Sequence, residues 1–285
     1  MAIIRVTTVL PYFLTLPEGE YTTPAAGGSV HLGLGSSGAA GGPTDEPRTE
    51  ASSTFDCGGA NEPEAIEKRR DAEAVRLLRR INMLLRWYRA LSGGADVLEL
   101  SRAQAAPFAF ADEQTGENWG GTPLQFQLPP TPAVDKTRSK LGDEVRAGLA
   151  NGNEPDVGEL NILDAEHAMH TGRFREAVLL AWSAIDATFA QGYERAMSPH
   201  LGGEYSDGRK FVLGHDIPMK VRMTAMLYLG VKQSLYRTLG DEWNRLAASY
   251  DNRNNVIHRG KTATQEEAEQ AIGVARRVTA IARTL

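Results

Sequence analysis

The residues best suited to acid–base and phosphate chemistry gather in one short run, from Tyr250 to Gly260. Four residues of α-helix advance by about 400°, so Tyr250, Asn254 and His258 would lie nearly one above another. Arg253 precedes His258 by five residues, which separates them by about 140° around a helix. They would meet only if the helix end distorts or a second copy completes the site. A histidine exchanges a proton near neutral pH, and an arginine fork binds phosphate oxygens.

The elements that must position this run are helices. A helix over residues 239–258 carries the run, and its apolar face is supplied by Trp243, Leu246, Ala247, Tyr250 and Ile257. Gly260 has the conformational freedom that a helix end requires. The segment 173–197 has apolar residues at helical spacing and is expected to be the central core helix. Further helices are expected over residues 133–150, 156–171, 218–230 and 265–284.

The run Arg253-Asn254-Asn255-Val256-Ile257-His258 resembles the signature of the HEPN family, in which an Arg, usually followed by Asn, precedes a His by four to six residues. An upstream segment, from Gly172 to Asp186, resembles the early helix of that family, whose apolar run typically ends in an acidic residue. Asp186 holds that place, where Glu is more frequent in the family. The resemblance covers residues 156–285, about half of the chain.

This resemblance implies a four- or five-helix bundle that forms a homodimer through its motif helices and cleaves RNA, tRNA among the candidates, without a metal or other cofactor. It implies that His258 transfers the proton and that Arg253 binds the phosphate, while Asn254 orients His258 or the phosphate. Asp186 would hold Arg253 or His258 in place. The expected products are a 2′,3′-cyclic phosphate and a 5′-hydroxyl end. Three neighbours would bind substrate: Tyr250, Arg259 and Lys261.

A non-catalytic interpretation stands beside this one. Many HEPN-like domains resemble binding or assembly modules, and the same Arg, Asn and His could form a polar network in a dimer interface. Two further histidines, His167 and His170, stand at helical spacing beside Glu166 and could bind a metal, but surface histidines are commoner than such a site without a third placed ligand.

Composition narrows the range of functions. The formal net charge is −5, and the 15 basic and 19 acidic residues before Asn151 are followed by 16 and 17 from there on. Neither half has the positive excess of a protein that grips long nucleic acid, although a small basic pocket for a short RNA is still allowed. Cys57 is the only cysteine, which suits a reducing cytoplasm. No apolar run is long enough to span a membrane.

The N-terminal half carries no catalytic motif, and its pattern predicts a small α+β domain over residues 1–130, ahead of an all-α helical domain at 156–285. A linker and lead-in helix would occupy 131–155, with the break at the Pro-rich residues 129–132. Strands are expected at 1–16, 29–34, 97–100, 107–111 and 122–128, a helix at 63–91, and a disordered Gly/Ala/Ser-rich loop at 35–61.

Much of the rest of the helix over 63–91, beside its apolar stripe, is filled by Arg76, Arg79, Arg80, Arg86 and Arg89. They could form an RNA-binding face, but such charges more often form a solvated face. The layout of a sensing domain ahead of a HEPN domain resembles prokaryotic defence and toxin systems. In that interpretation the N-terminal domain recognises a trigger or a protein partner and positions the RNase.

Overall fold

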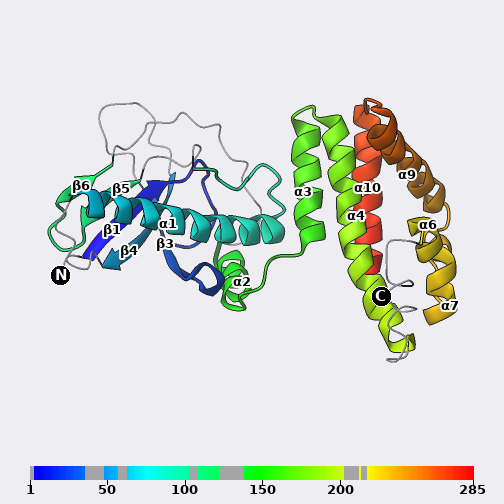
Figure 1. Ribbon diagram of the computed structural model, residues 1–285, viewed down its shortest axis with the longest axis horizontal. Helices are drawn as coiled ribbons and strands as arrows, with labels where there is room; N and C mark the ends of the chain where they lie inside the picture. Colours follow the sequence, from blue (N-terminus) through cyan, green and yellow to red (C-terminus); the bar gives the residue numbers. More distant parts are fainter. Residues whose placement is uncertain are drawn as a thin grey trace. The chain divides into compact units, whose positions relative to one another are not determined.

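The computed structural model describes residues 3–35, 48–56, 63–102, 108–121, 138–201, 212 and 217–285. The chain divides into two compact units, Met1–Pro155 and Asp156–Leu285. The first combines an antiparallel sheet with helices, and the second is mostly helical (Figure 1). The expected order, an α+β domain followed by a helical one, is confirmed at that level. The second unit starts at Asp156, the residue at which the helical domain was expected to start.

The sheet of the first unit has six strands in the order β2-β3-β4-β1-β5-β6, and every pair is antiparallel. Their bounds are β1 Ile3–Val9, β2 Gly19–Thr23, β3 Gly28–Gly35, β4 Arg48–Asp56, β5 Ala109–Asp112 and β6 Asn118–Gly120. In β1 the buried residues Ile4, Val6 and Thr8 alternate with more exposed ones, as in a strand with one face on a core.

Helix α1, Pro63–Ser92, packs on that core face, and α2, Arg138–Ala150, packs beside it (Figure 1). The buried stripe of α1 is the one that its periodicity predicted, from Ala74 to Tyr88. Helix α2 was expected to be part of a linker. It belongs instead to the first unit, because Leu141, Val145 and Leu149 are buried in the same core.

Two expectations for the first unit were wrong. The segment 35–61 was expected to be a loop, but β4 lies within it; its side chains are mostly small or polar, so it lacks the large apolar residues that identify a strand in a sequence. Residues 97–100 form no strand, and their backbone groups bond outside any ladder: the N–H of Leu98 bonds to the Tyr12 hydroxyl, and the N–H and C=O of Leu100 bond to the side chain of Asn82. The expected strand at 122–128, the Pro-rich break and Cys57 lie outside the described residues.

The arginines of α1 do not form one solvated face. Arg80 and Arg89 are buried, at 9% and 3% exposure. Arg86 bonds to Glu99 and Glu154, and Arg76 bonds to Glu73. Only part of the set is therefore available to solvent or to a ligand.

In the second unit, α3 (Val157–His170), α4 (Phe174–Met197) and α10 (Gln265–Ala282) pack side by side, and α9 (Glu242–Arg259) is inclined to them (Figure 1). Helix α4 is central, as expected, with its large buried side chains Trp182, Phe189 and Tyr193 in the core. The capping box at Thr264 and Glu267 starts α10.

Two helices are more broken than their apolar patterns predicted. The expected helix over 218–230 consists of α6, Met219–Val221, a π-helical turn η3, Arg222–Met226, and α7, Leu227–Val231. The motif helix begins at Glu242 rather than at residue 239. Leu239 ends a separate short helix, α8 (Leu235–Leu239), and Gly240 follows with a positive φ of 54°.

The first turn of α3 provides a test of the second unit's stability. The Asp156 carboxylate accepts a bond from the N–H of Glu159 at 2.9 Å and pairs with Arg283 at 3.2 Å. Burial raises the pKa of Asp156, but Arg283 and the Glu159 N–H outweigh burial and leave this pKa below its ordinary value.

We expect Asp156→Ala to lower the free energy of unfolding of the second unit by about 1 kcal/mol near neutral pH. Because the folded-state pKa is depressed, the difference should persist above the ordinary carboxyl range and vanish as the pH falls through the folded-state value. Urea unfolding followed by circular dichroism at several pH values measures it. Asp241→Ala is the matched control, because Asp241 precedes α9 without a side-chain cap bond. Equal losses in the two variants would contradict the assignment.

Candidate functional site

The motif run occupies the C-terminal half of α9, which ends where the sequence predicted. Gly260 has a φ of 64°, and the Asn255 carbonyl accepts bonds from the N–H groups of Gly260 and Lys261. A glycine adopts this left-handed conformation without a Cβ penalty. The last helical turn, with His258 and Arg259, is therefore fixed in place although both side chains are exposed.

A buried hydrogen bond fixes α9 against α4. The indole Nε1 of Trp182 donates to Oγ of Ser249 at 3.0 Å, and both residues are buried. One residue further along, the rings of Tyr250 and Trp182 make a T-shaped contact with centroids 5.3 Å apart. Lys220 covers Tyr250 at 4.8 Å and pairs with Asp251 at 3.1 Å. Tyr250, expected to bind substrate, thus already contacts Trp182 and Lys220.

Arg253, Asn254 and Asp186 come together at the next turn. Arg253 Nη1 donates to Asn254 Oδ1 at 3.0 Å, and Arg253 Nη2 lies 3.7 Å from Asp186 Oδ2 on α4. Of the two groups that Asp186 was expected to hold, it is Arg253 that it contacts. The Asp186 side chain is 46% exposed, so this ion pair is open to solvent and contributes little to stability, at most about 1 kcal/mol.

His258 does not join that cluster within one protomer. Its imidazole is exposed, and within the described ranges neither it nor the Arg259 guanidinium has a hydrogen-bond partner. Lys261 is engaged, since its ammonium bonds to Glu267 at 2.6 Å and to Asn252 at 3.3 Å. The bond from Lys261 lowers the pKa of Glu267, and the Thr264 N–H lowers it further.

Sequence reasoning gave no role to Arg175. Its Nη2 donates to the Val256 carbonyl on the motif helix at 3.4 Å, so this arginine lies beside the same turns of α9 as Asn254 and His258. It also lines a hollow of about 460 Å³ with residues 172–176, Leu179, Thr262 and Ala263. A signal was present, because Arg175 precedes Asp186 by eleven residues, which places the two on nearly the same face of α4, within roughly 20°.

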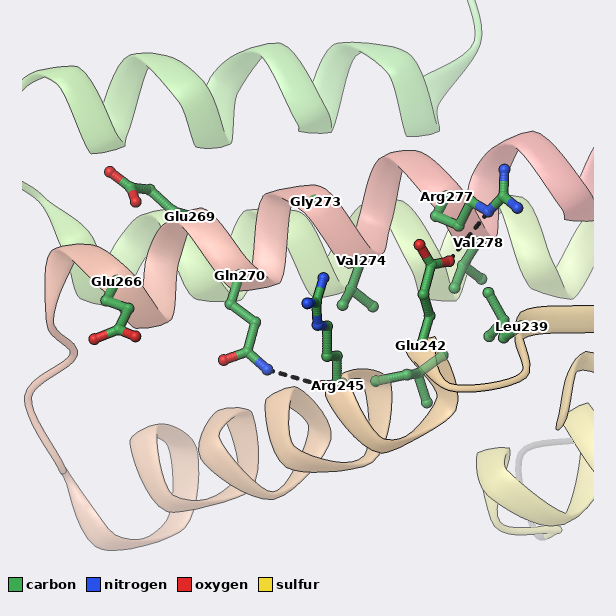
Figure 2. A pocket seen from close by; sticks show the side chains of 11 residues that line it. Leu239, Glu242, Arg245, Glu266, Glu269, Gln270, Gly273, Val274, Arg277 and Val278 are labelled. Carbon is green, nitrogen blue, oxygen red and sulfur yellow. Dashed lines mark hydrogen bonds and ion pairs between the residues drawn. The ribbon is translucent and has the colours of Figure 1, made fainter.

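A larger groove, of about 550 Å³, lies between the first turns of α9 and the helix α10 (Figure 2). Arg245 extends from α9 toward α10, and Glu242 pairs with Arg277 at 3.2 Å. Gln270 donates to the Arg245 carbonyl, while Glu266 and Glu269 carry negative charge toward the other end. None of the predicted site residues lines this groove.

No family model, curated protein or solved structure matches the chain. No helix among the described residues is long and apolar enough to cross a membrane. The same residues contain no group of three or more His, Cys, Asp and Glu side chains placed to hold a metal. Glu166, which stands beside His167 in the sequence, is paired with Arg276.

The bond between Trp182 and Ser249 gives a prediction about the positioning of α9. Ser249→Ala leaves the buried indole N–H without an acceptor, which should cost about 1–3 kcal/mol of unfolding free energy and change the fluorescence of Trp182. Ser183→Ala is the matched control, since that exposed hydroxyl donates to the Leu179 carbonyl of its own helix. A Ser249→Ala protein as stable as wild type would show that the bond does not anchor α9.

Proposed function

We propose that the helical unit is a metal-independent endoribonuclease of the HEPN type, which acts as a homodimer. The observation that carries this proposal is the contact between Arg253 and Asp186. It joins the two segments, on α9 and α4, that separately resemble the HEPN family. A chance Arg-to-His spacing on one helix would give no reason for the upstream acidic residue to lie beside that arginine.

The proposed reaction is attack of the RNA's own 2′-hydroxyl on the adjacent phosphorus. His258 exchanges the proton with the 2′-oxygen or the leaving 5′-oxygen, and Arg253 stabilises the negative charge on the phosphate oxygens. Asn254 orients Arg253, to which it is bonded. The bond from phosphorus to the 5′-oxygen breaks as the bond to the 2′-oxygen forms, which leaves a 2′,3′-cyclic phosphate and a 5′-hydroxyl.

The weakness of the ion pair supports a phosphate-binding role for Arg253. A guanidinium in a solvent-exposed pair at 3.7 Å loses little when it exchanges Asp186 for a phosphate. A charge-assisted bond to that phosphate contributes about 1.5–3 kcal/mol, so the exchange is favourable. Two further arginines would add positive charge for a short RNA. Arg259 follows His258 in the sequence, and Arg175 contacts the motif helix at the Val256 carbonyl.

A second protomer would complete the site. His258 and Arg253 lie about 140° apart around one helix, and His258 has no partner in the described part of its own chain. Ile257, beside His258, is a large apolar side chain that is 41% exposed. A two-fold dimer through α9 would cover Ile257 and bring the His258 of one copy toward the Arg253 of the other.

The proposal for the whole chain is a cytoplasmic defence or toxin protein. In it, the N-terminal unit recognises a trigger or a protein partner, and the helical unit cleaves RNA. This part of the proposal rests on the resemblance of the domain layout alone.

One observation favours a second function, a non-catalytic dimerisation or assembly module. Arg253 already has two partners within its own chain, Asn254 and Asp186, so it could serve only to shape the surface of α9. In that case the motif residues would be buried in the dimer interface, and no substrate would reach His258.

Cleavage assays distinguish the two functions. In EDTA, the wild-type protein should cut total RNA or tRNA to cyclic-phosphate ends, and His258→Ala and Arg253→Ala should each lower the rate at least about 100-fold. Arg277→Ala is the control and should remain active, because it removes an exposed arginine of α10 that pairs with Glu242 at the start of α9, away from the motif residues. Absence of cleavage by a dimeric wild-type protein, with the trigger or partner supplied, would favour the assembly function.

A mixing experiment tests whether the site is shared. If Arg253 of one copy acts with His258 of the other, an equimolar mixture of the two inactive variants contains heterodimers with one intact site. Exchange of subunits should then restore roughly a quarter of the wild-type activity, since half of the dimers are mixed and each has one of two sites. A mixture as inactive as its components would indicate that each protomer uses its own pair.

The dimer itself is testable at Ile257. We expect Ile257→Asp to convert the dimer to a monomer in sedimentation or light scattering, because it would place a charge in a covered apolar contact. Leu229→Asp is the matched control, since Leu229 is 67% exposed and lies on α7 rather than α9. Dimerisation that survives Ile257→Asp, or that fails equally in both variants, would rule out an interface centred on this part of α9.

A further inference from the structure

The first unit contains a polar cavity where the neighbouring strands β3 and β4 separate. The ladder between β3 and β4 runs from Gly35 to His31, which pairs with Ser52, and ends there. Among the described strands, the beginning of β3, at Gly28 and Ser29, pairs with β2 alone. A cavity of about 460 Å³ lies at this separation.

The side chain of Arg80 reaches this cavity from α1. It is 9% exposed, and its Nη2 donates to the carbonyl of Gly27 at 2.8 Å. Its Nε is fully buried and has no hydrogen-bond partner, and within the described ranges no carboxylate pairs with Arg80. A buried guanidinium with one carbonyl acceptor is unfavourable by itself, because burial removes its hydration without a compensating anion.

The backbone at Gly28 is shaped around this guanidinium. A Cβ at residue 28 would lie 2.6 Å from Cζ of Arg80, so a larger residue there would displace the guanidinium. Gly28 also has a φ of 151°, a conformation that L side chains rarely adopt.

The rest of the lining indicates what the cavity would bind. Hydroxyl groups predominate, and an imidazole is present: Ser29, Ser52, Ser53, Thr54 and His31. Arg5 also lines the cavity, but its charge is paired with Glu113. Glu20 carries a further negative charge at the exposed side. Among the described lining residues, Arg80 is thus the cation that no carboxylate pairs with, and hydroxyl side chains line the same cavity.

We propose that this cavity binds the phosphate group of a small phosphomonoester, such as a nucleoside monophosphate or a sugar phosphate. Arg80 pairs with the phosphate, and the serine and threonine hydroxyls donate to its remaining oxygens. Of the two arginines in the described lining, Arg5 is paired and Arg80 is not, and a single available arginine favours one phosphoryl group over a polyphosphate. The Glu20 carboxylate accepts from hydroxyls of the organic part. The volume is in the range of small-molecule sites.

This site is independent of the proposed RNase function, because all of its residues belong to the first unit. If the RNase proposal holds as well, the phosphomonoester is a chemically defined candidate for the trigger.

Calorimetric titration of the full chain tests the site with three probes: inorganic phosphate, adenosine 5′-monophosphate and adenosine. Phosphate and the monophosphate should bind saturably at up to millimolar concentration, and adenosine should not. Arg80→Met, which keeps an apolar stem, should weaken binding of the monophosphate at least about tenfold. Circular dichroism verifies that this variant is folded.

Ser29→Asp gives a second test that leaves Arg80 in place. It adds a carboxylate to the cavity wall, which should also weaken binding of the monophosphate at least about tenfold through competition for Arg80. Thr22→Asp is its matched control, because Thr22 pairs with Ser29 across β2 and β3 but does not line the cavity. Three results would each overturn the proposal: no binding of either phosphate probe, equal binding of adenosine, or unchanged binding in both Arg80→Met and Ser29→Asp.

Discussion

The buried hydrogen bond from Trp182 to Ser249 is the interaction on which the candidate site depends. Helix α9 has a narrow apolar stripe, and its buried positions, Leu246, Ser249 and Val256, do not by themselves define how it is rotated against α4. A directional bond in a buried setting does so, because an indole N–H left without an acceptor would cost more than most apolar contacts contribute. With Ser249 fixed, the following turn places Arg253 beside Asp186.

Arg253 in the second unit and Arg80 in the first differ in burial and in their charge partners. Arg253 lies in an exposed pair that exchanges easily, whereas Arg80 is buried with a single carbonyl acceptor and an unpartnered Nε. An exposed pair is compatible with the proposed role of Arg253, in which its guanidinium exchanges a carboxylate for an RNA phosphate. A buried cation without a counter-ion suits a group whose charge is satisfied only when a ligand is present, since the ligand then removes an existing penalty.

The sequence predicted those elements whose large apolar residues recur at helical spacing. The stripes of α1 and α4 gave their positions, and Gly260 gave the end of α9, because burial of large side chains and freedom of φ are local properties of the chain. Strand β4 escaped prediction because it consists largely of small and polar residues, and it is held by pairing with β1 and β3. The break between α8 and α9 was missed because Leu239 continues the apolar pattern across Gly240.

The same limit applies to the candidate-site residues, because their contacts depend on segments that are far apart in the sequence. The resemblance to the HEPN family indicated that Asp186 would hold Arg253 or His258. Which of the two it contacts depends on how α9 is inclined to α4. The spacing of residues along one helix does not predict the angle between two helices. The burial of Arg80 was equally inaccessible. In the sequence, an arginine beside an apolar stripe is compatible with a solvated face. Arg80 differs from Arg79 because its guanidinium lies against Gly28, about fifty positions earlier in the chain, where the absence of a Cβ leaves space for it. Side chains whose role is set by another segment's backbone can be located only once the two segments are seen together.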